Sequence, residues 1–264
     1  MEEPTAQTAA ARAHPPSPGE TLGLALGDCC LRLPLPAVDS RVTLSQLVAP
    51  ARAICDQLVD HLRRQAGRHN RPISCRKGCS ACCRYLVPLS VPEALLLPTE
   101  TPALTRPRAQ GAFLAAARNL LRAGSPPALE GLEPHQAQQA ISDWYVHANV
   151  TCPFLANSCC QVYPHRPLAC REHLALSNPD SCSPNALDPA LLVACRISVT
   201  TALSDLAAEL EGTGPEAVML PLARLWWHEN RRRNQTRYPA QLAIRRLGQL
   251  LQAQTLRPTA SSAA

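Results

Sequence analysis

Apolar residues recur every three or four positions over several stretches of the chain, which is the pattern of amphipathic helices. The clearest stretch predicts a helix over residues 44–67. Thr43 and Gln46 form a capping box at its start, and Gly67 is a natural end. Pro50 falls within this helix and is expected to bend it.

A second capping box, formed by Ser90 and Glu93, predicts a short helix that Pro98 ends. The same periodicity predicts further helices over residues 107–123, 134–147, 189–212, 220–230 and 239–253. Short β-strands are expected only around residues 85–89 and 161–163. The predicted fold class is therefore mainly α, with at most minor β.

The chain divides into three expected regions. Residues 1–40 are rich in proline, alanine and glycine and lack a sustained apolar period, so we expect a poorly ordered extension that the fold does not need. Residues 41–255 are expected to form one helical domain. Residues 256–264 are expected to be a flexible tail.

Composition narrows the class of protein. With 46% hydrophobic and 17% charged residues, the chain is too apolar to be disordered throughout. Its net charge of +6 is carried almost wholly by arginine and permits an acidic partner without requiring one. The sequence lacks an uncharged apolar stretch of membrane-spanning length and an N-terminal secretory signal, so we expect a cytoplasmic protein.

The 13 cysteines carry the chemical signal of this sequence. A reducing cytoplasm disfavours disulfides, so closely spaced cysteines there indicate a metal-binding or catalytic role. The first group consists of Cys75, Cys79, Cys82 and Cys83. Because Cys82 and Cys83 are adjacent, they are expected to point in different directions and to serve different metals, unless one of them is not a ligand.

A proline-rich segment supplies five more cysteines, Cys152, Cys159, Cys160, Cys170 and Cys182. This segment has no helical period, and a bound metal would fix it in place. We expect the two segments to share a site, because the helices between them can return the chain to the same end of the fold. The expected fold is thus a small helical domain organised around cysteine-rich metal-binding loops.

The cysteine blocks and their neighbours resemble a known family. Cys75-x3-Cys79-x2-Cys82-Cys83, Cys152-Pro-Phe-Leu, Cys160-Gln-Val-Tyr and Arg166-Pro-Leu-Ala-Cys170-Arg171 follow one another as in the YkgJ-type cysteine-cluster family, whose conserved region is described as zinc- or iron-chelating. The resemblance covers residues 75–182. It implies metal ligation by Cys75, Cys79, Cys82, Cys83, Cys152, Cys160 and Cys170, with Cys182 as an eighth ligand. It assigns no reaction, so whether the chain is an enzyme stays open.

Other residues near these blocks are weaker candidates. Cys55 and Cys195 fall on apolar helix faces and are expected in the core, Cys159 is a weaker ligand candidate, and Cys29 and Cys30 lie outside the matched blocks. His165 and His173 flank Cys170 and are expected to support the ligands by hydrogen bonding. Arg166 and Arg171 are expected to stabilise the loop and to donate hydrogen bonds to metal-bound thiolates, whose negative charge they would offset.

Several alternatives remain open. The metal is zinc or iron, and an iron–sulfur centre is slightly favoured because four closely spaced cysteines suit a compact cluster. The first alternative function is an iron–sulfur redox or radical enzyme, or a methyl-transfer enzyme similar to the flagellin lysine N-methylases. The second is nucleic-acid binding through Arg231, Arg232, Arg233, Arg237, Arg245 and Arg246, although such a charge run is usually a solvated helix face. A metal ion is therefore the expected partner, nucleic acid is disfavoured, and no protein partner is specified.

Overall fold

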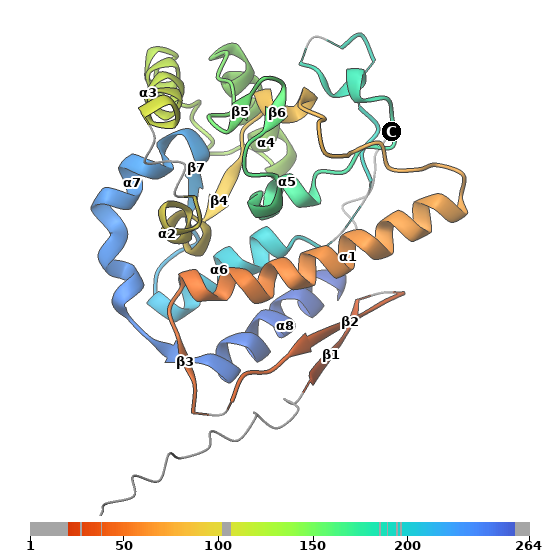
Figure 1. Cartoon of the computed structure of the whole chain (residues 1–264), viewed down its shortest axis with the longest axis vertical. Coiled ribbons are helices and arrows are strands. Elements are labelled where there is room, and N and C mark those ends of the chain that lie inside the picture. Colours follow the sequence, from red (N-terminus) through yellow and green to blue (C-terminus); the bar gives the residue numbers. More distant parts are fainter. Residues whose placement is uncertain are drawn as a thin grey trace, which may run out of the picture.

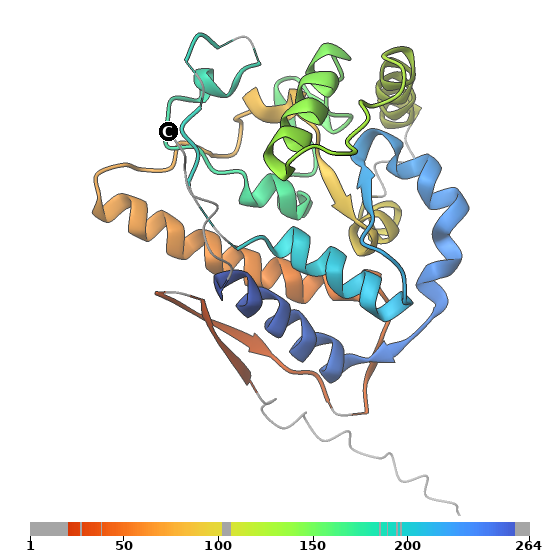
Figure 2. The same cartoon turned by 180° about the vertical axis from the view of Figure 1, so that it is seen from behind.

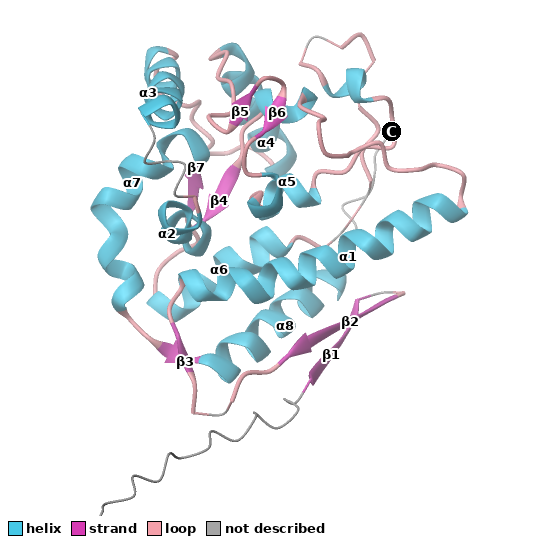
Figure 3. Ribbon diagram, in the orientation of Figure 1, coloured by secondary structure: helices cyan, strands magenta, loops and turns pink. Residues whose placement is uncertain are grey.

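The computed structural model describes residues 21–256, apart from residues 27, 38, 102–106, 185, 189, 194 and 196. Its helices are α1 (Val48–Arg68), α2 (Val91–Glu100), α3 (Pro107–Arg122), α4 (Pro134–His147), α5 (Leu168–Glu172), α6 (Val199–Glu211), α7 (Ala223–Asn230) and α8 (Ala240–Leu256). Its strands are β1 (Thr21–Leu26), β2 (Cys29–Pro34), β3 (Arg41–Val42), β4 (Pro88–Ser90), β5 (Leu155–Ala156), β6 (Cys159–Cys160), β7 (Ala217–Met219) and β8 (Tyr238–Pro239). Helices dominate the molecule (Figure 3), which confirms the predicted mainly α class. Of the described helices, none has the length and apolarity needed to cross a membrane.

The described strands pair only in twos. The pairs are β1–β2, β3–β8, β4–β7 and β5–β6, and each is antiparallel. Two of them join distant parts of the chain, since β3 and β4 precede α1 and α2 whereas β8 and β7 precede α8 and α7. One alternative for this sequence is a radical enzyme, a class built on parallel βα repeats. No such repeat is found among the described strands.

The largest core lies between α1, α6 and α8, which run side by side (Figures 1 and 2). Ile54 of α1, Leu203 and Leu206 of α6, and Leu247 of α8 are all buried in it. These residues belong to the helical stripes seen in the sequence, because side chains three or four positions apart share one face of a helix. The helical period therefore identified the principal core.

Residues 21–40 differ from the expected poorly ordered extension. β1 and β2 form a hairpin in which Leu24 pairs with Leu31, and it covers α1 and α8. Alternate side chains of the hairpin point into the core, and Leu24, Leu31 and Leu33 are at most 2% exposed. Large apolar residues here alternate with smaller or polar ones, which is the period of a half-buried strand. The three-to-four-residue spacing of helices therefore did not predict this hairpin. Residues 1–20 lie outside the described residues.

Two prolines behave differently from the prediction. Pro50 lies in the first turn of α1, where a helix has no N–H hydrogen bond for proline to break, so the expected bend has no cause. Pro98 lies inside α2 and does not end it, since the helix continues to Glu100. The capping box of Ser90 and Glu93 at the start of α2 is confirmed.

The helix predicted from residue 189 begins ten residues later, at Val199. Ser198 is its N-cap, and the Ser198 Oγ accepts a hydrogen bond from the Thr201 N–H. The preceding chain is held in extended form instead, because the Leu176 N–H donates to Leu191 O and the Val193 N–H to Leu174 O. As a result, the apolar stripe expected ahead of Val199 does not form.

A second layer lies on the opposite side of α1 and α6 from the hairpin (Figure 1). It contains α2, α3, α4, α5 and α7, together with the cysteine-rich segments. Phe113 of α3 packs edge-to-face on Phe154, with ring centroids 5.3 Å apart. Phe154 follows Cys152 by two positions, so this contact fixes the second cysteine segment to a helix.

Replacing Leu31 by alanine tests the role of the hairpin. Because this side chain is 2% exposed, we expect Leu31→Ala to lower the free energy of unfolding by about 2–5 kcal/mol in urea denaturation. Arg32→Ala is the matched control, since its side chain lies on the outer face of the same strand. Equal stability of the two variants, or a chain starting at Arg41 that melts like the full chain, would contradict the packing role.

Candidate metal centre

The first cysteine block forms a tight turn followed by one turn of 3-10 helix. The Cys79 N–H donates to Arg76 O, and Gly78 between them has a φ of 92°, a left-handed conformation that favours glycine. Residues Ala81–Arg84 then form the 3-10 helix η2, which carries Cys82 and Cys83. The block thereby places four half-buried thiols on a short piece of chain.

The second block joins the first through the backbone. The Cys152 N–H donates to Cys83 O at 2.8 Å. Asn157 and Ser158 then have positive φ angles of 50° and 55°, so a two-residue turn connects β5 to β6. Side chains alternate along β6, so Cys160 is half-buried toward the cluster whereas Cys159 is exposed.

The last two candidate ligands come from short helices. Cys170 lies in the middle of α5, and Cys182 is buried at the end of the 3-10 helix η5 (Pro179–Cys182), which contacts η2. Between them the chain returns to the first block, because the Ala175 N–H donates to the Cys75 Sγ at 3.2 Å. The structure therefore brings all eight predicted ligands into one region of the molecule.

Electrostatic effects among the thiols show which ones are neighbours. Burial raises the pKa of Cys182, and the charges of Cys75, Cys82 and Cys79 raise it further. Burial likewise raises the pKa of Cys75, with Cys82 and Cys79 adding to the effect. We name these four cysteines the outer set.

The other four thiols form an inner set, Cys83, Cys152, Cys160 and Cys170. The hydrogen bond that Cys83 donates to Cys152 raises the pKa of Cys83 to about 12. Burial raises the pKa of Cys170, and the charges of Cys82, Cys83 and Cys160 add to it. Cys82 lies between the sets, since its own pKa is raised first by a hydrogen bond to Cys83 and then by burial.

These thiols suit a metal by donor type. Sulfur is the ligand that zinc and iron–sulfur centres take from cysteine, and a bound cation reverses the raised pKa of a thiol by removing its proton. Within the described residues, however, no three histidine, cysteine, aspartate or glutamate side chains converge closely enough to hold an ion as they stand. Cys82 instead donates a hydrogen bond to Cys83, and Cys83 donates one to Cys152, as neutral thiols do.

The remaining cysteines lie away from both sets. Cys55 is fully buried in α1, as predicted, and burial raises its pKa. Cys195 is exposed and precedes α6, so its predicted place on an apolar helix face is wrong, because that helix starts only at Val199. Cys29 is buried in the hairpin, and Cys30 and Cys159 are exposed.

The two histidines that flank Cys170 have different surroundings. His165 lies beside Glu100, with its Nδ1 3.8 Å from a carboxylate oxygen, and about half of its side chain is exposed. Burial lowers the pKa of His173, so its ring is neutral near pH 7. His173 also lies beside the outer set, because its carbonyl oxygen is 3.7 Å from the Cys75 Sγ.

The two arginines of the last block also have different surroundings. Arg166 stacks over the Tyr163 ring, with its guanidinium carbon 3.9 Å from the centroid. The positive charge of Arg166 lowers the pKa of four thiols, Cys75, Cys82, Cys160 and Cys170. Burial and neighbouring thiols have a larger effect, so the pKa of each is raised overall. Arg171 instead donates to Asp56 Oδ1 at 2.5 Å, to Arg166 O at 3.0 Å and to Pro164 O at 2.5 Å. Its contacts are those of a residue that fastens the loop to α1.

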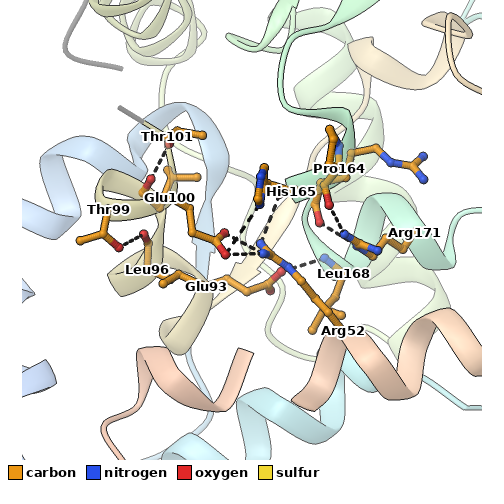
Figure 4. A network of polar contacts seen from close by, with 12 residues as sticks. Arg52, Glu93, Leu96, Thr99, Glu100, Thr101, Pro164, His165, Leu168 and Arg171 are labelled. Carbon is orange, nitrogen blue, oxygen red and sulfur yellow. Dashed lines mark hydrogen bonds and ion pairs between the residues drawn. The ribbon is translucent and has the colours of Figure 1, made fainter. Parts of the chain in front are cut away.

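A buried polar network, drawn in Figure 4, fixes the same loop to α2. Glu93 is 4% exposed, and its carboxylate accepts hydrogen bonds from the Ser90 N–H and Oγ and, at 2.7 Å, from the Leu168 N–H. Arg52 of α1 donates to both carboxylate oxygens of Glu100 and to His165 O. Both contacts hold the segment that leads into Cys170.

Sequence reasoning missed most of this network. It found the capping role of Glu93 but not its bond to Leu168, and it did not single out Arg52 or Glu172. Glu172 accepts four hydrogen bonds from Ser198, Val199 and Thr200 at the start of α6. The one available signal was that Glu93 stands among apolar residues in the run VPEALLL, where an unpaired carboxylate would be costly.

The C-terminal arginines are in part paired with carboxylates. Arg233 binds both oxygens of Glu211 and one of Glu216, and Arg246 binds both oxygens of Glu209. These ion pairs neutralise part of the charge run that the nucleic-acid hypothesis relied on.

Comparison with known families adds one finding. Residues 74–186 match the model of the CxxCxxCC family, described as "Putative zinc- or iron-chelating domain". The match spans all eight candidate ligands and confirms the resemblance seen in the sequence. No curated protein and no solved structure matches the chain.

Replacing Arg171 separates loop fastening from metal binding. We expect Arg171→Met to lower the free energy of unfolding by about 1–3 kcal/mol, because a largely buried charged donor is lost, while the metal content per folded chain stays the same. Arg166→Met is the matched variant, and there we expect metal to be lost more readily to a chelator. The reverse pattern would contradict these roles.

The pH dependence of stability tests the burial of Glu93. Burial raises its pKa above the ordinary value of 4.5, so the folded chain binds this proton more tightly than the unfolded chain. The Glu93 contribution to the free energy of unfolding should therefore fall as pH rises above 4.5 towards the folded pKa. The measurement is the free energy of unfolding of wild type minus that of Glu93→Gln, obtained by urea denaturation at several pH values. If this difference rose with pH, the predicted direction of the pKa shift of Glu93 would be wrong.

Proposed function

Because residues 74–186 carry the domain of the CxxCxxCC family, we propose that this protein chelates zinc or iron through clustered cysteine thiolates. The observation that carries the proposal is the meeting of eight cysteines in one region, seven from the four matched blocks together with Cys182. They lie close enough that the charges of neighbouring thiols raise the pKa of Cys75, Cys83, Cys170 and Cys182. Thiols gathered in this way repel one another once they ionise, and a cation removes that repulsion.

We further propose that the thiols serve two centres, one for the outer set and one for the inner set. Four thiolates are the usual complement of a zinc ion or an iron–sulfur cluster. The backbone supports the division, because η2 turns between Cys82 and Cys83 and the Cys83 carbonyl binds the inner-set residue Cys152. Cys82 borders both sets, so the centres would be neighbours.

Charge supports a compensating role for Arg166. Four thiolates around one divalent ion leave a net charge of about −2 at each centre. Arg166 is near members of both sets, and its guanidinium favours their ionised forms. Arg171 faces Asp56 instead and holds the Cys170 loop in position.

An iron–sulfur centre is our preferred form of the proposal, with zinc as the alternative. When bound, such a centre would supply electron transfer, whereas zinc would supply folding stability alone. The chain's own residues bury the thiols and hold the loops. We place this chemistry in the cytoplasm, where cysteines stay reduced.

Replacing one cysteine from each set tests the proposal. We expect Cys79→Ser and Cys160→Ser each to lose the metal of one centre, about half of the total, because each removes one ligand of four. The assay is anaerobic purification followed by elemental analysis and an absorption spectrum, in which iron–sulfur protein is brown.

Cys159→Ser and Cys195→Ser are the controls, since both side chains are exposed outside the sets. Equal metal content in Cys159→Ser and Cys160→Ser would contradict the ligand assignment. Complete loss of metal from either Cys79→Ser or Cys160→Ser would contradict the division into two centres, and colourless protein with stoichiometric zinc would exclude the iron preference.

A further inference from the structure

The outward side of α3 carries apolar and basic side chains together. Leu114 and Leu121 are 51% and 71% exposed, and they are seven positions apart, so they lie on one stripe of the helix. Arg108, Arg118 and Arg122 are exposed as well. Because a helix has about 3.6 residues per turn, these arginines lie on a second stripe beside the leucines. We name these five residues the α3 face.

The opposite side of α3 fixes the orientation of this face. Phe113, Ala116, Ala117 and Leu120 are buried in the second layer. The Phe113 ring packs on Phe154, with the ring centroids 5.3 Å apart. Figures 1 and 2 show α3 at the outer edge of that layer from front and back. The α3 face is consequently convex and turned to solvent.

The charge of the α3 face is not balanced within the described part of the chain. Its three arginines make no hydrogen bond or ion pair with another described residue. In the sequence, residues 101–129 contain four arginines and no aspartate or glutamate. Arg108 lies in the first turn of α3, where the helix dipole disfavours a positive charge, so helix stability does not explain it. A negatively charged partner would offset this charge.

The two leucines decide between the classes of partner. Nucleic acid would bind the arginines through its phosphates but would leave Leu114 and Leu121 in water. A helix-binding groove on another protein takes apolar anchors at i, i+3 or i+4, and i+7, whereas the exposed residue between the two leucines is Arg118. An anionic bilayer accepts both halves of the face, because its headgroups attract arginine and its acyl boundary takes up leucine.

We propose that the α3 face docks the protein onto the surface of an anionic bilayer. The helix lies along the membrane plane, with Leu114 and Leu121 at the boundary between headgroups and acyl chains and the arginines at the negatively charged headgroups. The contact of Phe113 with Phe154 then holds the second cysteine segment beside the bilayer. Docking does not depend on the metal, so it adds a location to the proposed chelation.

The test measures how full-length protein, isolated anaerobically, sediments with lipid vesicles. One preparation is phosphatidylcholine with about one-third phosphatidylserine, and the other is phosphatidylcholine alone. We expect binding to the anionic vesicles, weakened by added salt because salt screens the arginines, and about tenfold or more weaker binding to the neutral vesicles. Circular dichroism and elemental analysis check the fold and the metal content of each sample.

Two triple variants test the charge of the face. The first combines Arg108→Gln, Arg118→Gln and Arg122→Gln. The control combines Arg63→Gln, Arg64→Gln and Arg68→Gln, at exposed positions of α1. Both remove three positive charges, so a difference between them reports the location of the charge and not its sum. We expect the affinity for anionic vesicles to fall about tenfold or more in the first variant and about twofold or less in the control.

Two double variants test the insertion of the leucines. The first combines Leu114→Gln and Leu121→Gln. The control combines Leu242→Gln and Leu256→Gln on α8, where the side chains are 68% and 83% exposed. All four side chains are exposed, so we expect the fold to be unchanged. The affinity for anionic vesicles should fall about tenfold or more in the first variant, because less apolar surface enters the bilayer, and stay at the wild-type level in the control.

Each other result overturns the docking proposal. Wild type that leaves anionic vesicles unbound, or binds neutral vesicles equally well, contradicts a charged bilayer as the partner. Equal affinity of the two triple variants, or of the two double variants, contradicts the α3 face as the contact. Duplex DNA bound in place of vesicles, and lost only in the first triple variant, would identify a nucleic-acid surface instead. Metal content should match wild type in all four variants, so failure here leaves chelation standing.

Discussion

The mutual proximity of eight thiols is the constraint on which the rest of this structure depends. Burial raises the pKa of Cys75, Cys170 and Cys182, and the charges of neighbouring thiols raise it further, so the neutral state is favoured. Neutral thiols bind one another only weakly, so the loops that carry them need other support. The fold supplies that support through backbone and carboxylate contacts made outside the cluster.

Helices provide the fixed frame for these loops. Glu93 at the start of α2 binds the Leu168 N–H, Arg52 of α1 binds His165 O, and Arg171 binds Asp56 of α1. All three contacts converge on the segment before and after Cys170, which has only a five-residue helix of its own. A partly buried network of this kind gives a loop one conformation, because leaving any member unpaired is costly. The scaffold thus holds the loops that carry the thiols in one region of the molecule.

An open pocket of about 380 Å³ beside the cysteine cluster gives the site an opening to solvent, and Cys82 and Cys170 lie in its wall. The Glu172 carboxylate accepts hydrogen bonds from the N-terminus of α6, and Tyr85, Gln138 and His173 also line the pocket.

The sequence by itself determined most of the longer helices and the identity of the cysteine blocks, because both are local signals. The stripes that became α1 and α8, the Ser90–Glu93 capping box and the spacing around Cys75 and Cys170 can all be seen without knowing what packs against what. Only the tertiary structure decided the hairpin that covers α1, the late start of α6 and the different contacts of Arg166 and Arg171. Each of these depends on a partner far away in sequence: the side chain of Arg171 is directed by Asp56, and residues 191–193 are held by residues 174–176. Local spacing carries no information about such contacts, since it specifies which residues share a face but not which surface that face meets.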